Sequence, residues 1–392
     1  MHVKRRATLL AGTLLALALV FFLTTKFAAS SRHKIAARDF SNSQMGRDIA
    51  ATEHERRAHA TQTNSEETRS GTNAADLYKK AGESWRALPL AERQLLANPR
   101  AEIEADKAAA LFAKLGPIMD LLYEARDADY CDWALDPFTS ETKFSQIEMA
   151  NTLGRVARWH AAYIFPTRPA WALDDLAARA QLGRSVADSI LGFMAESAFN
   201  ATAIDLVHSN AARLNTSATE QSLEFLQTFA LADDVPRAMR GELSLLRERL
   251  AMKPAAGAAQ RVVFPDGEAR EQTEWLQRVE AEFSERATWP EDDFRTWWSA
   301  VSDEGKSRPF AAGALPVLTT LREQVKRDTV RRTMLAAGLS ALRDGAEALA
   351  FFADPASGGA FVYTETAEGF ELRSALQNKG RPVRMWFATP PR

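Results

Sequence analysis

The stretch from Ala101 to Ala125, AEIEADKAAALFAKLGPIMDLLYEA, indicates the fold class of this chain most clearly. Its apolar residues recur three or four positions apart, which is the spacing of side chains that share one face of an α-helix. The expected buried stripe consists of Ala109, Phe112, Leu115 and Met119. Pro117 lies inside the stretch and lacks the N–H that a helix needs, so we expect a kink or a break there.

The same helical spacing extends through most of the chain on both sides of this stretch. Before it, Asn73 is expected to cap a helix whose inner face carries Leu77, Ala81, Trp85 and Leu88. After it, a loop at 127–142 precedes helices expected at 144–165, 170–210, 218–232, 236–252, 271–288, 290–303 and 309–342. Pro316 is placed to divide the last of these into two.

The C-terminal segment changes to a period of two, which is the period of a β-strand. AFVYTET (360–366), FELRSAL (370–376) and PVRMWFAT (382–389) are separated by short turns that contain Gly369 and Gly380. Three strands alone are marginally stable, so an aromatic face with Phe361, Tyr363, Phe370 or Trp386 should pack against a helix. The predicted fold class is mainly α: a multi-helical extracytoplasmic domain with a small C-terminal antiparallel β meander, preceded by one transmembrane helix.

The N-terminus has the pattern of a membrane anchor. Three basic residues, Lys4, Arg5 and Arg6, precede an uncharged apolar run from Ala7 to Thr25. As a helix this run would span roughly 28 Å, close to the hydrocarbon thickness of a bilayer. A cleaved signal peptide shares the pattern, but the length of the run and Lys26 directly after it favour an uncleaved anchor. We expect a single pass through a bacterial inner membrane, with the bulk of the chain periplasmic.

The topology prediction depends on the very short N-terminal tail, because basic residues on the two sides of the run nearly balance. The expected organisation is a cytoplasmic tail (1–6), a transmembrane signal anchor (7–25), a polar tether (26–72), a helical domain (73–252), a boundary (253–269) and a helical subdomain (270–392) that ends in the meander (360–389). The tether is too hydrophilic to offset the entropy cost of ordering it. Proline, glycine and a short RVVF run mark the boundary.

Composition limits the possible partners. The chain has 49 basic and 51 acidic residues, and a net charge of −2 argues against nucleic acid as a partner. Cys131 is the only cysteine, so no intrachain disulfide can form, and a buried, unreactive thiol is the commoner state for such a residue. No cofactor is predicted.

The segment DPASGGAFVYTETAEGFELRSAL, from Asp354 to Leu376, resembles a D-P-x-S-G…G-F-x-L-x-S module of uncharacterised membrane-anchored helical proteins of the planctomycete–verrucomicrobial kind. The segment is also similar to the end of type II secretion pseudopilins, where an Asp-Pro turn leads into two strands. That resemblance implies a secretion-related ancestry. It does not extend to the N-terminus, because the residues from Arg5 to Leu9 contain neither the glycine nor the glutamate of a pseudopilin processing site.

Glu196 is the nearest approach to a catalytic residue. Glu196-Ser197-Ala198-Phe199-Asn200, followed by Ala203, resembles the E-S-x-F-N-x-x-A start of the lytic transglycosylase motif. The resemblance implies that Glu196 is a general acid, which requires burial to raise its pKa. The family pattern continues with glycines that the segment 204–209 lacks. A helix with Phe193, Ile204 and Leu206 inward and Glu196 in solvent is the competing interpretation.

Three further groups could carry chemistry. Asp127, Asp129 and Asp132, with Asp136 after them, could offer oxygen ligands to calcium, although their spacing does not fit an EF-hand and a solvated loop is the alternative. His160 and His208 lie in apolar helical contexts, which favours satisfied core or boundary residues over ligands or bases. Arg322, Lys326, Arg327, Arg331, Arg332 and Arg343 crowd one helix. This basic helix could bind acidic partners or lipid headgroups, but a solvated face is expected.

Two functions follow from these observations. The first is a non-catalytic periplasmic helical protein, held to the inner membrane through residues 7–25, that binds or scaffolds an envelope protein; the C-terminal resemblance implies a relation to secretion. The alternative is a peptidoglycan-cleaving hydrolase, similar to a lytic transglycosylase, that uses Glu196. A catalytic Glu196 should lie at the floor of a deep cleft beside other polar groups.

Overall fold

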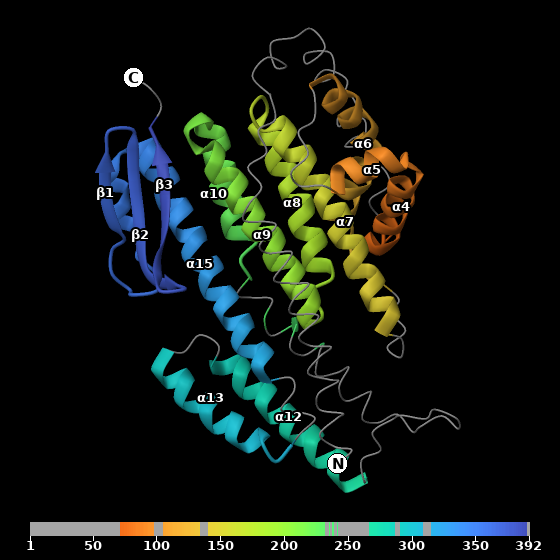
Figure 1. The fold of residues 1–392 in the computed structure, drawn as a ribbon, viewed down its shortest axis with the longest axis vertical. Helices are drawn as coiled ribbons and strands as arrows, with labels where there is room; N and C mark the ends of the chain where they lie inside the picture. The colour runs from red at the N-terminus through yellow and green to blue at the C-terminus, as the bar shows by residue number, and fades with distance from the viewer. Residues whose placement is uncertain are drawn as a thin grey trace.

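The structure, a computed structural model, describes residues 71–97, 105–133, 140–231, 235, 237–238, 241, 266–286, 291–308 and 315–389. The described chain is mainly helical and ends in a small antiparallel sheet, as the sequence predicts (Figure 1). The elements are α4 (Ala74–Ala87), α5 (Leu90–Ala97), α6 (Ala105–Arg126), α7 (Ser140–Ile164), α8 (Pro169–Ser185), α9 (Ile190–Asn210), η1 (Ala211–Arg213), α10 (Thr216–Thr228), α12 (Asp266–Arg286), α13 (Glu291–Gly305), α15 (Leu315–Asp344), η3 (Ala346–Phe351), β1 (Val362–Thr366), β2 (Gly369–Asn378) and β3 (Arg381–Ala388).

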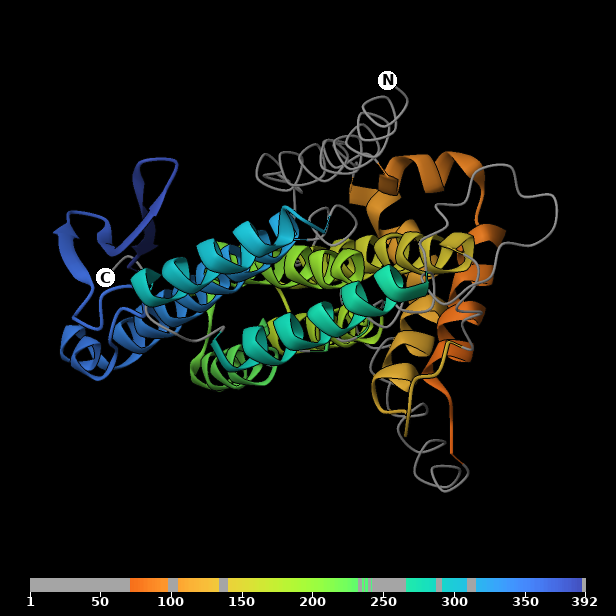
Figure 2. The same ribbon diagram turned by 90° about the horizontal axis from the view of Figure 1, so that it is seen from below.

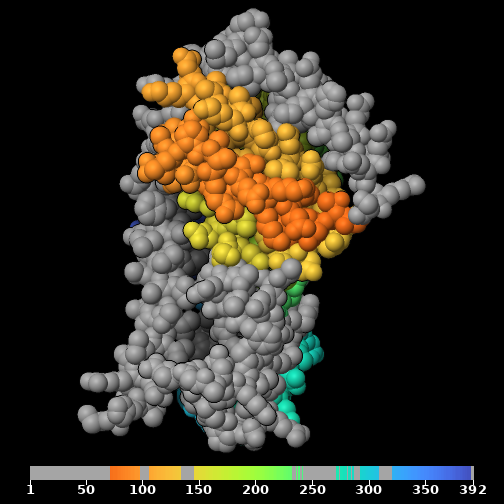
Figure 3. Space-filling view, turned by 90° about the vertical axis from the view of Figure 1, so that its right-hand side faces the viewer, coloured from red at the N-terminus to blue at the C-terminus, as the bar shows by residue number. Residues whose placement is uncertain are grey.

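The N-terminal helices form a layer on one side of α7. Asn73 caps α4 as predicted, because its side chain accepts a hydrogen bond from the Ala75 N–H at 3.1 Å. Figure 3 shows the orange helices α4 and α5 lying across the yellow α7. The predicted stripe of α6 is fully buried. The helix continues through Pro117, so a break there was wrong: buried neighbours such as Leu115 and Met119 hold both halves against the core.

The stretch predicted as one helix at 170–210 is two helices, α8 and α9, that fold back on each other. The reversal occupies 186–189, where Ser189 caps α9 by accepting the Gly192 N–H at 3.1 Å. A side chain at Gly192 would lie 1.6 Å from the Val186 carbonyl oxygen, so only glycine fits this turn. Both halves are apolar, and folding back lets each bury its side chains against the other.

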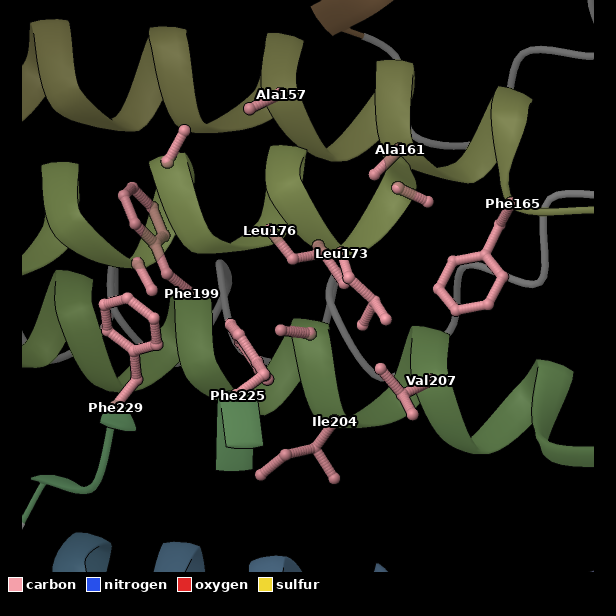
Figure 4. Packing of buried hydrophobic residues seen from close by; sticks show 14 of the residues in the cluster. Ala157, Ala161, Phe165, Leu173, Leu176, Phe199, Ile204, Val207, Phe225 and Phe229 are labelled. Atoms are coloured by element: carbon pink, nitrogen blue, oxygen red, sulfur yellow. The ribbon is translucent and has the colours of Figure 1, made fainter. Parts of the chain in front are cut away.

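The main core lies between α6, α7, α8 and α9 and continues to α10, α15 and the sheet. Figure 4 shows Ala157 and Ala161 on α7 and Leu173 and Leu176 on α8 in this layer, with Ile204 on the neighbouring α9. Small residues on α7 allow the helices to approach closely, and the larger side chains fill the space between them. The sheet lies at one end of the molecule and the orange helices lie at the other (Figure 2).

A second, smaller core joins α12, α13 and the start of α15 to the start of α9. Phe283 of α12 packs edge-on against Phe294 of α13, with ring centroids 5.8 Å apart. Because α15 contributes Leu321 to this core and Val330 to the main core, it connects the two. Pro316 lies in the first turn of α15, where a proline removes no hydrogen bond of the helix. Residues 309–314, on the other side of the division predicted at Pro316, lie outside the described residues. The predicted boundary at 253–269 and the helix at 236–252 lie almost wholly outside the described residues.

The C-terminal meander is confirmed, with strand order β1-β2-β3. Lys379 and Gly380, both with positive φ, form the two-residue turn between β2 and β3. The sheet packs on α15, where Phe387 lies directly against Gly338. Phe361 and Phe370 are buried as predicted, but Tyr363 and Trp386 are exposed. Since side chains alternate between the faces of a strand, an inward Phe387 requires an outward Trp386.

The predicted anchor at 7–25 and nearly all of the tether at 26–72 lie outside the described residues. Within the described residues, one helix is long and apolar enough to cross a membrane: Ile190–Arg213, of whose apolar window 72% is buried inside the fold. This helix comprises α9 and η1 and forms part of the main core.

Candidate functional site

A buried polar network crosses the main core between α6, α7 and α8. Nδ1 of His160 lies 2.6 Å from Oδ2 of Asp175, and both side chains are fully buried. The hydroxyl of Tyr123 donates a hydrogen bond to the other oxygen of Asp175. Phe112 covers one face of the imidazole at a centroid distance of 4.1 Å. A carboxylate only accepts, so both His160 and Tyr123 orient their hydrogens toward Asp175.

The arrangement of Asp175 and His160 is that of the orienting half of a catalytic triad, in which a carboxylate fixes the tautomer of a histidine base. With the Nδ1 hydrogen directed at Asp175, Nε2 is the nitrogen left to act as a base. Nε2 is buried and has no hydrogen-bond partner among the described residues. A base has to reach the proton that it removes. Enclosed as it is, the pair fixes how the helices pack and offers no catalytic surface.

Glu196 lies on α9 and is only 1% exposed, so the expectation of a solvated side chain was wrong. Its Oε1 is 3.7 Å from Nε of Arg184 on α8. The helices approach closely because Gly183 faces the Glu196 backbone: a Cβ there would lie 3.1 Å from the Glu196 Cα. A glycosidic oxygen must come within hydrogen-bond reach of a general acid. Glu196 is instead enclosed between helices and paired with a cation.

Arg179 is a buried cation that the sequence analysis missed. It lies on α8 and donates to the carbonyl oxygens of Gly154 on α7, at 2.7 Å, and Phe199 on α9, at 2.6 Å. Its guanidinium also stacks on the Phe199 ring, 4.3 Å from the centroid. Desolvation, and after it the charge of Arg158, lowers the pKa of Arg179 well below its usual value. Arg179 therefore joins three helices, and the glycines at 154 and 183 were the sequence signal for this close approach.

The three described acids of the loop, Asp127, Asp129 and Asp132, make separate contacts, and Asp136 lies outside the described residues. Asp127 pairs with Arg126 at 2.8 Å, and Asp129 accepts the Thr72 N–H at 2.9 Å. Asp132 contributes its backbone, whose N–H and carbonyl both bond to the side chain of Asn73. Across the described ranges, no group of three or more His, Cys, Asp or Glu side chains could hold a metal ion. The loop fastens the start of α4 to the rest of the fold.

Cys131 lies in the same loop and is exposed, where a buried thiol was expected. The tight contacts of the loop with the start of α4 hold its backbone at the surface. Desolvation raises the pKa of the thiol to about 11, so it is protonated near neutral pH and a weak nucleophile.

His208 connects α9 to the sheet. Its Nε2 lies 2.7 Å from the carbonyl oxygen of Trp386, and its ring meets Phe387 edge-on at 5.0 Å. Burial lowers the pKa of His208, with opposing effects from the Trp386 carbonyl and Asp205 and a further lowering by Arg331. His208 therefore holds the sheet in place in its neutral form.

The basic helix, now α15, is not a solvated cationic face throughout. Arg322 is buried and its guanidinium lies 3.8 Å from the centroid of the Phe294 ring. Arg332 is buried, pairs with Asp328 and donates to the Leu226 carbonyl at 2.9 Å. Arg331 bonds to Asp205 on α9. The prediction that these side chains lie on a solvent-exposed face was wrong. Because α15 takes part in both cores, much of its surface faces other elements.

Exposed apolar side chains concentrate in the C-terminal module, defined here as residues 346–389, which comprises η3 and the sheet. Phe351 is 87% exposed, Val362 56%, Trp386 43% and Tyr363 38%. Every residue of β1 is exposed. Figure 1 shows β1 as the outermost strand of the sheet, on the side away from β3. Val362 and Trp386 share one face of the sheet and Tyr363 lies on the other, so both faces of the module carry exposed apolar side chains. Gathered exposed apolar side chains are typical of a region that binds another macromolecule.

No protein-family model matches the sequence, and searches of curated proteins and of solved structures gave no significant match. The resemblances to planctomycete–verrucomicrobial proteins, to pseudopilins and to lytic transglycosylases therefore stay predictions.

Proposed function

We propose that this chain is a non-catalytic binding or scaffold protein of the bacterial cell envelope, secretion-related in ancestry. In this proposal residues 7–25 anchor it in the inner membrane, the bulk of the chain is periplasmic, and the C-terminal module binds an envelope protein. The observation that carries the proposal is a contrast in exposure. The ionisable groups best suited to acid–base chemistry, Glu196, His160 and Asp175, are enclosed in the helical core, whereas large apolar side chains face solvent on the C-terminal module.

This contrast is the reverse of what a hydrolase needs. An enzyme that cleaves peptidoglycan must expose its acid to a polymer, and a buried carboxylate between packed helices cannot meet one. A binding protein needs exposed apolar and aromatic side chains, which supply most of the energy at protein interfaces. The predicted tether fits a binding role because a long polar linker gives reach without fixing orientation.

The test is affinity purification of the tagged, full-length protein from detergent-solubilised membranes of its host after mild crosslinking. The binding variant is Phe351→Ser with Trp386→Ser. The matched control is Leu90→Ser, which removes a side chain of similar exposure, 59%, from α5. We expect the wild type and the control to recover the same envelope protein and the binding variant to lose it. Recovery of the bait alone, or equal recovery by all three proteins, would refute the proposal.

A further inference from the structure

Besides its exposed side chains, the C-terminal module presents the edge of β1, where a partner could bind more specifically. We propose that the free edge of β1 accepts an extended, basic segment of a partner protein, which adds to the sheet as a further strand. This inference rests on the proposed function and specifies the partner chemistry at the same module.

The backbone of β1 has unused hydrogen-bonding groups along one edge. The turn between β1 and β2 pairs Thr366 with Gly369, and bonded pairs alternate along an antiparallel ladder. Thr366, Thr364 and Val362 therefore direct their N–H and C=O groups to β2. Tyr363 and Glu365 direct theirs outward, and β1 has no neighbour on that side in the described sheet. Such an edge is a template for another strand.

β1 has no lysine, proline or bulge, which are among the features that block such an edge, although it is a short strand of five residues and carries one charge, Glu365. The strand reads VYTET, without lysine or proline, and its register with β2 is regular from Val362 to Thr366. The irregularity in the sheet is instead on the other side, where the pairing of β2 with β3 shifts between Arg373 and Gln377. Valine, tyrosine and threonine also favour extended backbone. The edge is regular and exposed, and a partner that neutralises Glu365 would remove the charge that opposes pairing.

The charge at this edge selects the partner. Glu365 and Glu368 are exposed, and within the described part of the chain neither side chain takes part in an ion pair. Arg373 and Arg384 do not neutralise them, because both lie near Glu371 on the other face of the sheet. A second copy of this chain would bring a like-charged edge against this one. A segment with lysine or arginine is complementary to it.

The alternation of side chains defines the partner further. Tyr363 and Glu365 lie two positions apart and therefore share a face of the sheet. On an added strand, the residue opposite Glu365 should be basic and the residue opposite Tyr363, two positions away, should be apolar. The ring centroids of Tyr363 and Phe370 are 5.5 Å apart, so an apolar residue beside Tyr363 would extend an existing aromatic cluster.

The probe is a fluorescein-labelled peptide, Thr-Val-Thr-Lys-Thr-Val-Thr, titrated against the full-length protein in detergent, with a twin that has glutamate in place of lysine. We expect the lysine peptide to bind about tenfold more tightly, since a cross-strand charge pair gains what a like-charge pair loses. Hydrogen exchange should slow at 362–366 when the lysine peptide binds. Equal binding of the two peptides, or protection confined to another segment, would overturn the inference.

Two variants test the contributions of the Glu365 side chain and of the β1 backbone separately. Glu365→Lys should invert the preference, so that the glutamate peptide binds more tightly. Tyr363→Pro removes an outward N–H and should abolish binding of both peptides, while melting curves report whether the sheet remains folded. Glu83→Lys, a charge reversal on the exposed side of α4, should change nothing. If Glu365→Lys keeps the original preference, the edge is not the binding site.

The crosslinking experiment distinguishes this inference from the proposed function. If Tyr363→Pro recovers the same envelope protein as the wild type, strand addition is wrong but the binding function stands. If the wild type recovers nothing, the binding function itself fails, whatever the peptide titrations show. Loss of the partner from folded Tyr363→Pro and from Glu365→Lys supports both.

Discussion

The carboxylate of Asp354 accepts a hydrogen bond of 2.7 Å from the hydroxyl of Ser374. Asp354 is buried in the turn before β1, whereas Ser374 lies in β2 where its pairing with β3 is interrupted. The other oxygen of Asp354 accepts the Ala375 N–H at 2.7 Å. The acid therefore satisfies donors that strand pairing leaves unused. This is the structural role of the Asp-Pro-x-Ser-Gly motif.

Replacing Asp354 should destabilise the C-terminal module. Asp354→Ala leaves the buried hydroxyl of Ser374 and the N–H of Ala375 without their acceptor, and we expect a loss of about 2 to 3 kcal/mol in the free energy of unfolding. Asp303→Ala is the control, because Asp303 is an exposed acid whose partner, Lys306, lies directly after the end of its helix. Chemical denaturation measures both. Equal losses in the two variants would show that the hydrogen bonds of Asp354 stabilise the fold no more than an exposed ion pair does.

Because Gly338 touches the ring of Phe387, we expect α15 to tolerate no larger residue at position 338 without a loss of stability. A Cβ at Gly338 would lie 2.0 Å from the Phe387 ring, so Gly338→Ala should cost about 1 to 3 kcal/mol by displacing the sheet. Phe387→Leu provides room. If the clash is the cause, the double variant will be more stable than the sum of the two single changes predicts. Strict additivity in denaturation experiments would contradict the contact.

Acid should weaken the attachment of the sheet through His208. Burial lowers the pKa of His208, so the unfolded chain takes up a proton at a higher pH, about 6.5, than the folded chain does. The stability from this residue is present above that pH and is lost as pH falls through 6.5 toward the folded pKa. His208→Gln keeps a donor for the Trp386 carbonyl but does not titrate. We expect wild type to lose more unfolding free energy than this variant between about pH 7.5 and 5.5. Equal losses in wild type and variant would show that His208 is not the source of the pH dependence.

Glu196 should matter for packing and not for peptidoglycan cleavage. Glu196→Gln removes the charge that faces Arg184, so we expect a lower melting temperature. In a muropeptide-release assay on purified sacculi, we expect neither wild type nor variant to release product. Release by the wild type that the variant abolishes would replace the binding proposal with the hydrolase. A known lytic transglycosylase run in parallel shows that the sacculi are digestible.

The helical elements of the fold were readable because they depend on local spacing. Asn73 as a cap, the stripe of α6 and the strands of the meander follow from periods of 3.6 and 2, which the sequence displays directly. Pro117 does not break α6, because the penalty of a proline depends on its position and on what packs around it. The reversal between α8 and α9 was missed because its apolar pattern continues on both sides of the turn.

The buried polar contacts were the least predictable. His160 and Asp175 are 15 positions apart, and nothing in their local sequence indicates that they meet. Arg179 looks like a surface residue of an amphipathic helix until Gly154 and Phe199 present their carbonyl oxygens to it. Solvent exposure also depends on tertiary contacts. Phe351 and Phe387 are equally apolar, yet Phe351 faces solvent and Phe387 lies in the core.

The helical class, the three strands of the meander and the prediction of a membrane anchor could all be derived from the sequence, because each depends on the order of neighbouring residues. The enclosure of Glu196, the role of α15 in both cores and the edge of β1 that is unpaired in the described sheet became visible in three dimensions. Burial and pairing depend on contacts between residues far apart in the chain, and the free energy of a carboxylate or a strand edge changes most with whether water or protein surrounds it.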